Sequence, residues 1–321
     1  MKAIRLVEKN LIRNMLNKTD KLVSVIILMY CHFEFLKETI QSICDQDYPN
    51  IEIIISDDAS KNFVRSEIEA IINTIIVPNG VTIKIRQNTQ NMGIVAHANL
   101  VASLCSGSYI KFLPPGDQFC THEALRVLIE TLDAQNTQVV TSPSWVYNQD
   151  SGDICYQYPS KRRAGLLQNR TPYELFSILS ESNIISAIGT LYKRDFFENG
   201  GFDISYRYLD DWPTWLRLYR NGCKIAVVYE PTTYYSIGGI SNKAGSAFES
   251  DILRDDLILC YEKEILPFVG QFPAKTRWFI EYRYGILKNN CSVWFKLKFF
   301  PADLYCNLKR FIKKLVLRKG I

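Results

Sequence analysis

Two short apolar runs enclose a helical repeat near the start of the chain, and this order constrains the fold more than any other feature. Leu22–Met29 is a nearly continuous apolar run, too short to span a membrane and suited to a strand buried on both faces. Ile51–Ile55 is a second such run. Between them, apolar residues recur every three or four positions, as on one face of a helix: Phe33, Leu36, Ile40 and Ile43. The pattern predicts an α/β domain with parallel central strands.

A polar turn follows the second run, at the position where open α/β sheets place their ligands. The turn is Ser56-Asp57-Asp58-Ala59-Ser60, and Tyr30 occupies the matching place after the first run. The carboxyl ends of parallel strands meet at one sheet edge, so we expect these side chains to line a ligand site. The plainer interpretation is a solvated turn or helix cap beside an ordinary half-buried aromatic residue.

The remaining pattern predicts further strands and helices along the same sheet. Helices are expected over 64–76, from after Gly93 to about 105, and over 121–132. Strands are expected over 81–85, 109–113, 138–142, 184–192 and 224–229. After about residue 250 the chain reads as helices, over 251–266 and 272–288. The alternation of strand and helix patterns along the chain favours one large α/β domain with a helical appendage.

Composition excludes several classes of protein. Of 321 residues, 47% are apolar and 22% charged, the balance of a globular chain. The nine cysteines are scattered singly and do not cluster with the three histidines, which indicates neither a zinc site nor a disulfide framework. A reducing compartment fits best. No stretch resembles a signal peptide or reaches the roughly 18 apolar residues of a membrane span, so we expect a cytoplasmic protein.

The opening unit resembles a known enzyme family. The order VSVII, Tyr30, Gln46-Asp47-Tyr48 and EIIISDDAS is similar to the start of the family 2 glycosyltransferases, inverting enzymes of GT-A fold. That fold is a Rossmann-like mixed sheet flanked by helices, which binds nucleotide-diphospho-sugars. The resemblance implies that Tyr30 stacks on the nucleotide base and that Asp57 and Asp58 hold the base and ribose. Leu28-Met29 replaces the usual Pro-Thr, so the base pocket departs from the family pattern.

A second block continues the resemblance. Asn91 and Gly93 form an N-x-G pattern before a helix that carries Asn99, as in the family, so all three are expected on the donor side. The Arg that commonly precedes this Asn is Ala98 here. Its phosphate contact would be lost or supplied by His97 or Arg86, although a histidine on the helix surface is the more ordinary interpretation of His97.

The family's metal-binding D-x-D turn falls on Leu113-Pro114-Pro115-Gly116-Asp117. Pro114 and Gly116 replace two of its carboxylates, which leaves Asp117 as the expected ligand of Mg²⁺ or Mn²⁺. Such cations keep several waters and take further ligands from substrate phosphates, so one protein carboxylate suffices. The cation would neutralise charge on the departing diphosphate. The alternative is a tight turn with an Asp cap.

A third block resembles the acceptor side of the family. Gly200-Gly201-Phe202-Asp203 is followed by the acidic pair Asp210-Asp211 at an expected helix start. Asp211 falls on the position of the catalytic base, which takes the proton of the acceptor hydroxyl. Asp210 replaces the commoner Glu and is expected to orient the acceptor or the base. Both carboxylates would also suit a helix N-terminus without any catalytic role.

The C-terminal region carries much of the positive charge. From Asp303 onward, Leu304, Leu308 and Phe311 share one helical face while Lys309 and Arg310 lie opposite, and aromatic residues precede them. A basic amphipathic helix suits the surface of an anionic membrane. A helix packed on its own domain fits equally well. Nucleic acid is not expected, because no recognised module accompanies the charge.

Together these observations predict an inverting glycosyltransferase of cell-surface polysaccharide synthesis. It would use a nucleotide-diphosphate-sugar donor and a saccharide or lipid-linked acceptor, in the cytoplasm or peripherally on the inner membrane face. The expected organisation is a leader over 1–20, a GT-A domain over 21–245, with a donor half to about 142 and an acceptor half after it, and a helical segment over 246–321. A non-catalytic GT-A scaffold is the alternative. A nucleotidyltransferase would want a Gly-rich basic loop, and this chain has Tyr30-Cys31-His32-Phe33 there.

Overall fold

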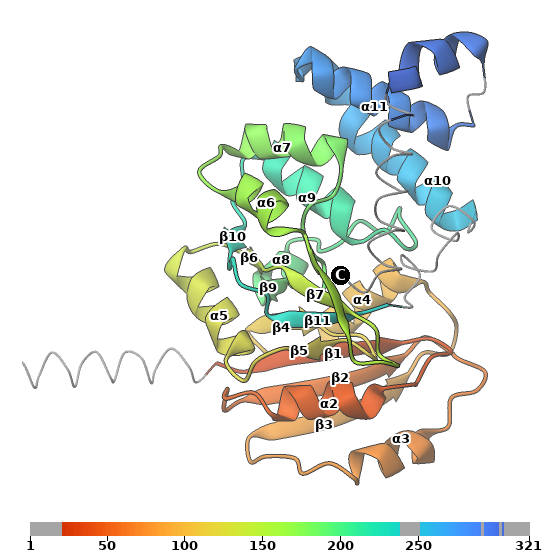
Figure 1. The fold of residues 1–321 in the computed structure, drawn as a ribbon. Coiled ribbons are helices and arrows are strands. Elements are labelled where there is room, and N and C mark those ends of the chain that lie inside the picture. Colours follow the sequence, from red (N-terminus) through yellow and green to blue (C-terminus); the bar gives the residue numbers. More distant parts are fainter. Residues whose placement is uncertain (1–20, 238–250, 290–291, 302–303, 305–321) are drawn as a thin grey trace, which may run out of the picture. The chain divides into compact units, whose positions relative to one another are not determined.

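The computed structural model describes residues 21–237, 251–289, 292–301 and 304 (Figure 1). The chain divides into two compact units. The first comprises 21–144, Ser186–Gly201 and Ile225–Tyr235. The second comprises Trp145–Ile185, Phe202–Lys224 and the described residues from 236 onward. None of the described helices is both long and apolar enough to cross a membrane.

The first unit is built on a seven-stranded mixed sheet in the order β10-β6-β9-β4-β1-β2-β3. The strands are β1 (Val23–Met29), β2 (Ile51–Asp57), β3 (Val81–Gln87), β4 (Tyr109–Phe112), β6 (Val139–Thr141), β9 (Leu191–Lys193) and β10 (Ala226–Val227). β1 pairs in parallel with β2 and β4, while β9 runs antiparallel to β4 and β6. Every residue of β2 is buried, as expected for a strand covered on both faces.

Helices cover both faces of this sheet because alternate side chains of its central strands point to opposite sides. Val23, Val25 and Ile27 of β1 share one core with α2 (Leu36–Cys44), α3 (Arg65–Ile72) and α5 (Ala124–Ala134). Ile26 and Ile54 face the other way and pack with residues of α4 (Ile94–Leu104). Phe197 of α8 (Arg194–Glu198) packs against that second core. The predicted α/β fold is therefore confirmed.

The expectation of a strand over 184–192 is wrong except at its end. Thr190 turns the chain back on itself: its backbone N–H donates to Ala187 O at 3.1 Å and its hydroxyl to Ser186 O at 2.7 Å. These local bonds use the groups that a strand would offer to its neighbours. Only Leu191–Lys193 joins the sheet.

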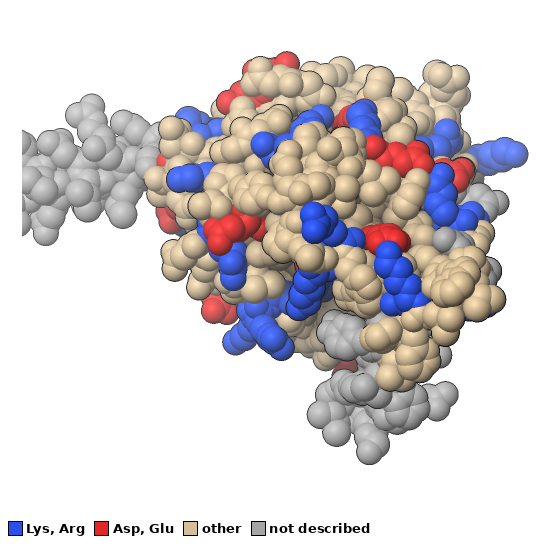
Figure 2. Space-filling model, turned by 90° about the horizontal axis from the view of Figure 1, so that it is seen from above, with Lys and Arg blue, Asp and Glu red and all other residues tan. Residues whose placement is uncertain are grey.

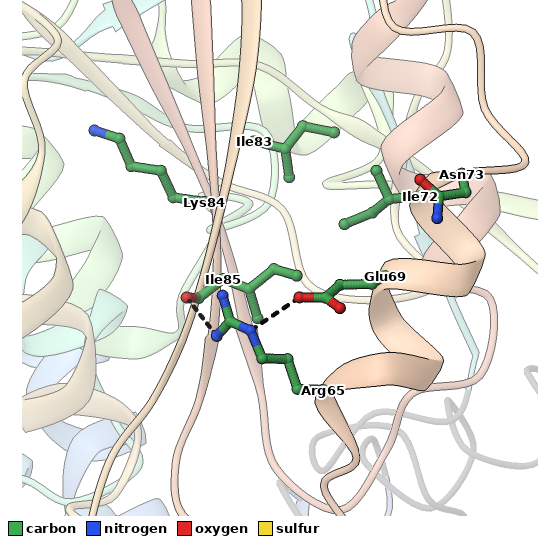
Figure 3. A pocket seen from close by; sticks show the side chains of 7 residues that line it. All are labelled: Arg65, Glu69, Ile72, Asn73, Ile83, Lys84 and Ile85. Atoms are coloured by element: carbon green, nitrogen blue, oxygen red, sulfur yellow. Dashed lines mark hydrogen bonds and ion pairs between the residues drawn. The ribbon is translucent and has the colours of Figure 1, made fainter.

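The outer edge of the sheet is partly covered by a side chain from α3. Arg65 forms an ion pair with Glu69 at 2.9 Å and donates to the backbone oxygen of Ile85 on β3 at 3.2 Å (Figure 3). The two residues lie beside a shallow hollow of about 450 Å³, whose walls also include Ile72 and Lys84. An arginine bound to an edge carbonyl obstructs pairing with a further strand. None of the residues predicted for the donor or metal site lines this hollow.

The second unit is mainly helical. Its elements include most of β7 (Ser144–Tyr147), β8 (Ile154–Tyr158), α6 (Lys161–Ala164), α7 (Pro172–Glu181), α9 (Asp211–Arg220), α10 (Asp251–Cys260), a π-helical turn (Tyr261–Ile265) and α11 (Ala274–Leu287). α7 begins with a complete capping box in which Thr171 and Glu174 satisfy each other's backbone N–H groups. α9 packs against α7, and its Trp215 is fully buried.

Residues 293–301 form a helix whose two sides differ. Phe295 and Phe299 pack with Tyr282 of α11, with the two phenylalanine rings 4.7 Å apart. Gly285 makes room for this contact, because a Cβ there would lie 2.2 Å from the Phe295 ring. The opposite side is apolar and exposed, with Trp294 at 82%. The basic helix predicted from Asp303 onward lies outside the described residues apart from Leu304.

Candidate active site

The turn after β2 is held by the carboxylate of Asp57. This fully buried side chain accepts from the Ser60 backbone N–H at 2.8 Å, from the Ser60 hydroxyl at 2.5 Å and from the Gln87 amide at 3.1 Å. Ala59 lies between them with φ of 65°, a conformation that non-glycine residues adopt rarely. Asp57 thus stabilises a sharp and strained turn at the sheet edge where a ligand was predicted.

Asp58 anchors a second loop, the one that leads into α4. Its carboxylate accepts from the Asn88 amide at 2.7 Å and from the backbone N–H groups of Met92 and Gly93, each at 3.0 Å. Asn91 reaches the same residue through the Asp58 carbonyl at 3.3 Å. The structure therefore brings the predicted residues Asp58, Asn91 and Gly93 together. Their contact with a nucleotide stays a prediction.

Tyr30 lies beside these loops with its side chain 51% exposed. Two bonds tie the chain around it to the Asp turn: Cys31 N–H donates to the Ser60 hydroxyl at 2.7 Å, and Asp58 N–H donates to Met29 O at 2.9 Å. An exposed aromatic ring on a fixed backbone is well suited to stacking, because little side-chain freedom is lost when a flat ligand binds.

A buried polar cluster lies behind the loops and includes His97, which is only 2% exposed. The interpretation of His97 as a surface histidine is therefore wrong. Its Nε2 lies 2.6 Å from the Ser56 hydroxyl, and Arg86 donates to the same hydroxyl at 2.8 Å and to Asn88 at 2.9 Å. Burial, reinforced by Arg86 and opposed by Asp58, lowers the pKa of His97. Near neutral pH the cationic member of the cluster is Arg86.

Asn99 of α4 lies against the double glycine that precedes Phe202. Gly201 has φ of 60°, and a Cβ there would come within 2.6 Å of the Asn99 side-chain oxygen. Both the backbone conformation and the close approach require glycine at this position. Asn99, predicted on the donor side, therefore packs against Gly201 within the first unit.

Asp117 ends a tight turn pinned to α2. Its backbone N–H donates to Pro114 O at 3.0 Å, and the Thr39 hydroxyl donates to Asp117 O at 2.8 Å and accepts from Gly116 N–H at 2.9 Å. Nearby on β4 is the fully buried Lys111, which donates to the carbonyls of Phe112 and Ile188. Burial lowers the pKa of Lys111 to about 7, and the negative charge of Asp117 opposes that shift.

The donor set around Asp117 sets a limit on any metal ion. Among the described residues, no group of three or more His, Cys, Asp and Glu could hold a metal. A single carboxylate fits Mg²⁺ or Mn²⁺ only when waters and substrate phosphates complete the shell. Asp117 can supply that single carboxylate, so the other ligands of a cation would have to be water and substrate phosphates.

Asp210 and Asp211 begin α9 in the second unit. Asp211 accepts from the amide of Asn183 at 2.7 Å and, through its other oxygen, from the Trp212 backbone N–H at 2.6 Å. The Trp212 indole donates to Leu179 O on α7 at 2.9 Å, which fixes the start of the helix. Asn183 is a residue of this cluster that the sequence did not single out.

The two carboxylates differ in their tendency to hold a proton. Burial and the adjacent Asp211 raise the pKa of Asp210 to about 7. Burial also raises the pKa of Asp211, but the hydrogen bonds from Trp212 and Asn183 oppose that shift. These hydrogen bonds favour the ionised form of Asp211, and an ionised carboxylate can accept a proton from a hydroxyl.

The loop before these carboxylates is held by Asp256 of α10. Its Oδ2 accepts from the backbone N–H groups of Arg207, Tyr208 and Leu209 at 3.0, 2.6 and 3.0 Å. Lys263 adds an ion pair with Asp203 at the other end of the loop. This anchor could not be predicted from the sequence, because neither spacing nor motif links Asp256 to a loop almost fifty residues earlier.

Comparisons with known proteins agree with this architecture. A family model described as glycosyl transferase family 2 matches residues 24–201. A processive diacylglycerol beta-glycosyltransferase of Mycoplasma genitalium is 25% identical over 76% of this chain and 71% of its own length. WfaP of Escherichia coli, a UDP-Glc:alpha-D-GlcNAc-diphosphoundecaprenol beta-1,3-glucosyltransferase, is 26% identical over 82% and 98%.

The fold also resembles a solved structure. The mannosyltransferase PcManGT from Pyrobaculum calidifontis, solved with GDP-Man and Mn²⁺, matches with a TM-score of 0.57 at 14% identity. The match covers 93% of this chain and 85% of that one. At this identity the likeness concerns the fold, and it confirms the predicted GT-A architecture.

Proposed function

Because this chain belongs to glycosyl transferase family 2, we propose that it transfers a sugar from a nucleotide-diphosphate-sugar, with inversion, to a saccharide or lipid-linked acceptor of a cell-surface polysaccharide. The observation that carries this proposal is the geometry of Asp211, a carboxylate at a helix start with both oxygens fixed by donors and with a raised pKa.

In the proposed reaction Asp211 removes the proton of the acceptor hydroxyl. The oxygen then bonds to the anomeric carbon as the bond from that carbon to the diphosphate breaks, and the electron pair leaves with the diphosphate. Asp210, whose pKa is raised to about 7, retains a proton for part of the time near neutral pH and can donate a hydrogen bond to the acceptor. On the donor side Tyr30 would stack on the base, while Asp57 and Asp58 hold the loops that surround it.

We assign the cation-binding role to Asp117. A bound Mg²⁺ or Mn²⁺ would offset negative charge on the diphosphate. The buried turn that carries Asp117 is fixed by Thr39, so the carboxylate would be presented without a large loss of freedom. That PcManGT was solved with Mn²⁺ supports the choice of metal.

A lipid-linked acceptor is the form we favour, because the two named relatives act on diacylglycerol and on a diphosphoundecaprenol-linked sugar. The helix over 293–301 supports a peripheral membrane contact: Val293, Trp294, Leu297 and Phe300 are all at least 63% exposed and lie beside the exposed Lys296 and Lys298. Apolar burial and attraction to anionic lipid act together on such a surface. The surface would hold the enzyme at the inner face of the cell membrane.

Nucleic acid is not part of the proposal. On the face drawn in Figure 2, Lys and Arg side chains of the described residues are interspersed with Asp and Glu, so no single basic patch dominates it. The net charge of +5 is modest for a chain of this length. A nucleic-acid site needs a concentrated basic surface.

A donor panel tests the function directly. Purified protein is incubated with a set of nucleotide sugars and with lipid-linked or free saccharide acceptors, with and without Mg²⁺ or Mn²⁺. We expect transfer from one donor class, dependent on metal and faster with the lipid-linked acceptor. Donor binding without transfer or hydrolysis under any condition would favour the scaffold.

Replacing Trp294 and Phe300 by Ser should reduce flotation with anionic vesicles, and unchanged flotation would refute the membrane contact.

A further inference from the structure

The side chain of Asn183 is oriented by its own loop. The backbone N–H of Ile185 lies 3.0 Å from Asn183 Oδ1. A backbone N–H can only donate, so the atom facing it must be the amide oxygen, and the amino group must then face the other way. That amino group lies 2.7 Å from Oδ2 of Asp211. The direction of the Asn183–Asp211 hydrogen bond is therefore fixed.

The loop itself is attached to its surroundings within the second unit. The Tyr158 hydroxyl donates to the backbone oxygen of Asn183 at 3.1 Å, and Arg163 donates to the side chain of Ser182. On the other side of the loop, the Trp212 indole holds the end of α7 to the start of α9. These hydrogen bonds hold the loop that carries Asn183 in place, and so fix the position of its amino group.

The consequence for Asp211 is both geometric and electrostatic. Trp212 N–H occupies one carboxylate oxygen and Asn183 the other, so rotation of the carboxylate would break a bond at each end. The bond from Asn183 also stabilises the ionised form, because its N–H points at the oxygen that carries negative charge. A carboxylate oxygen has a second lone pair, so Oδ2 can still accept the proton of a hydroxyl.

We propose that Asn183 is the positioning residue for the catalytic base, which it holds in one orientation and in its ionised state. This inference rests on the proposed function, since it assumes that Asp211 acts as the base. In the step itself, the proton moves from the acceptor hydroxyl to Asp211 while Asn183 keeps both of its amide hydrogens. Asn183 acts only through Asp211.

The test is the pH dependence of kcat/KM for the variant Asn183→Ala. Activity requires ionised Asp211, so it falls tenfold per pH unit below the pKa of that group. Loss of one charge-assisted hydrogen bond should move this acidic limb upward by about one pH unit. The variant should thus lose about tenfold in kcat/KM on the limb and less above it.

Asn183→Asp makes the test sharper because it preserves size and shape. One oxygen can still accept from Ile185 N–H, but the other would face Asp211, and two close carboxylates do not both ionise readily. Its acidic limb should lie at still higher pH than that of Asn183→Ala. If the alanine variant fails to fold, the aspartate variant carries the test alone.

Thr276→Val is the matched control. It removes the 2.7 Å hydrogen bond to Glu181 at the end of the same helix α7 and should leave the limb where it is in the unmodified protein. A limb unmoved in both Asn183 variants would overturn the inference, as would equal losses at all pH values. Asp211→Asn distinguishes a failure of the proposed function from a failure of this inference. If Asp211→Asn keeps full activity, the assignment of Asp211 as the base has failed. If Asp211→Asn is inactive and the acidic limb of both Asn183 variants is unmoved, only the role of Asn183 is refuted.

Discussion

Removing the carboxylate of Asp256 should loosen the loop that leads to the proposed base. Asp256 is 6% exposed, and its Oδ2 is shared by the backbone N–H groups of Arg207, Tyr208 and Leu209. Asp256→Ala would leave these donors without that partner. Each buried donor left unsatisfied costs about 1–3 kcal/mol, and water entering the vacated space recovers part of it, so we expect a loss of about 2–5 kcal/mol in the free energy of unfolding.

Asp256→Asn should be milder because its amide oxygen can occupy the place of Oδ2. The amino group then replaces Oδ1, which accepts from Arg207 N–H at 3.1 Å. We expect the free energy of unfolding to fall by about 1–2 kcal/mol. A neutral amide oxygen is a weaker acceptor than a carboxylate, and the new amino group would face the Arg207 N–H, which is also a donor. Both variants should lower kcat more than they weaken donor binding, because the loop continues into Asp210 and Asp211.

The measurement is urea unfolding of both variants, followed by steady-state kinetics and donor titration. Asp255→Ala is the matched control, since it removes the same charge from the preceding, exposed position of α10. Its stability should change by less than about 0.5 kcal/mol. If Asp256→Ala were no less stable than Asp255→Ala, the loop would not depend on this carboxylate and the reasoning would fail.

Three further predictions concern the first unit. Burial lowers the pKa of Lys111 in the folded protein to about 7, below its unfolded value of 10.5. Between these two pH values only the unfolded chain binds the proton. The free energy of unfolding should therefore rise with pH in this range, by up to about 1.4 kcal/mol per pH unit. Thermal or urea unfolding of Lys111→Met should lack that component, and identical slopes would contradict it. Gly93→Ala, at φ of 81°, should cost about 1–2 kcal/mol in stability and weaken donor binding measured by calorimetry; unchanged values would show that the turn tolerates a Cβ. Asp117→Ala should abolish the dependence of donor binding on Mg²⁺ or Mn²⁺, and a variant that still responds to added metal would remove Asp117 from the cation site.

The central sheet was readable from the sequence because its signals are local. Ile51–Ile55 is apolar at every position except Glu52, and the structure extends it only to Asp57. Period and turn residues likewise placed β3 and α4 within a few residues. Periodicity failed over 184–190, where the Thr190 hydroxyl donates to Ser186 O and the Ser186 hydroxyl accepts from Gly189 N–H, which closes a turn that a hydrophobic pattern does not reveal.

The candidate site was readable only in part. The motifs identified Asp58 and Asp211 but not the groups that hold them, because Asn88, Asn183 and Asp256 come from distant stretches and carry no motif of their own. His97 was misjudged for a related reason: helical spacing does not say that a polar side chain faces a buried serine hydroxyl. Contacts of this kind are set by tertiary packing, which overrides local pattern.

The role of Asp211 as catalytic base is tested most directly by Asp211→Asn, with transfer and donor binding measured on the same preparation. Asparagine preserves the shape and can still accept from Trp212 N–H, but it cannot take a proton near neutral pH. We predict that the rate of sugar transfer falls at least about a thousandfold, while the dissociation constant of the donor changes less than about threefold. Transfer at the rate of the unmodified enzyme would contradict the account.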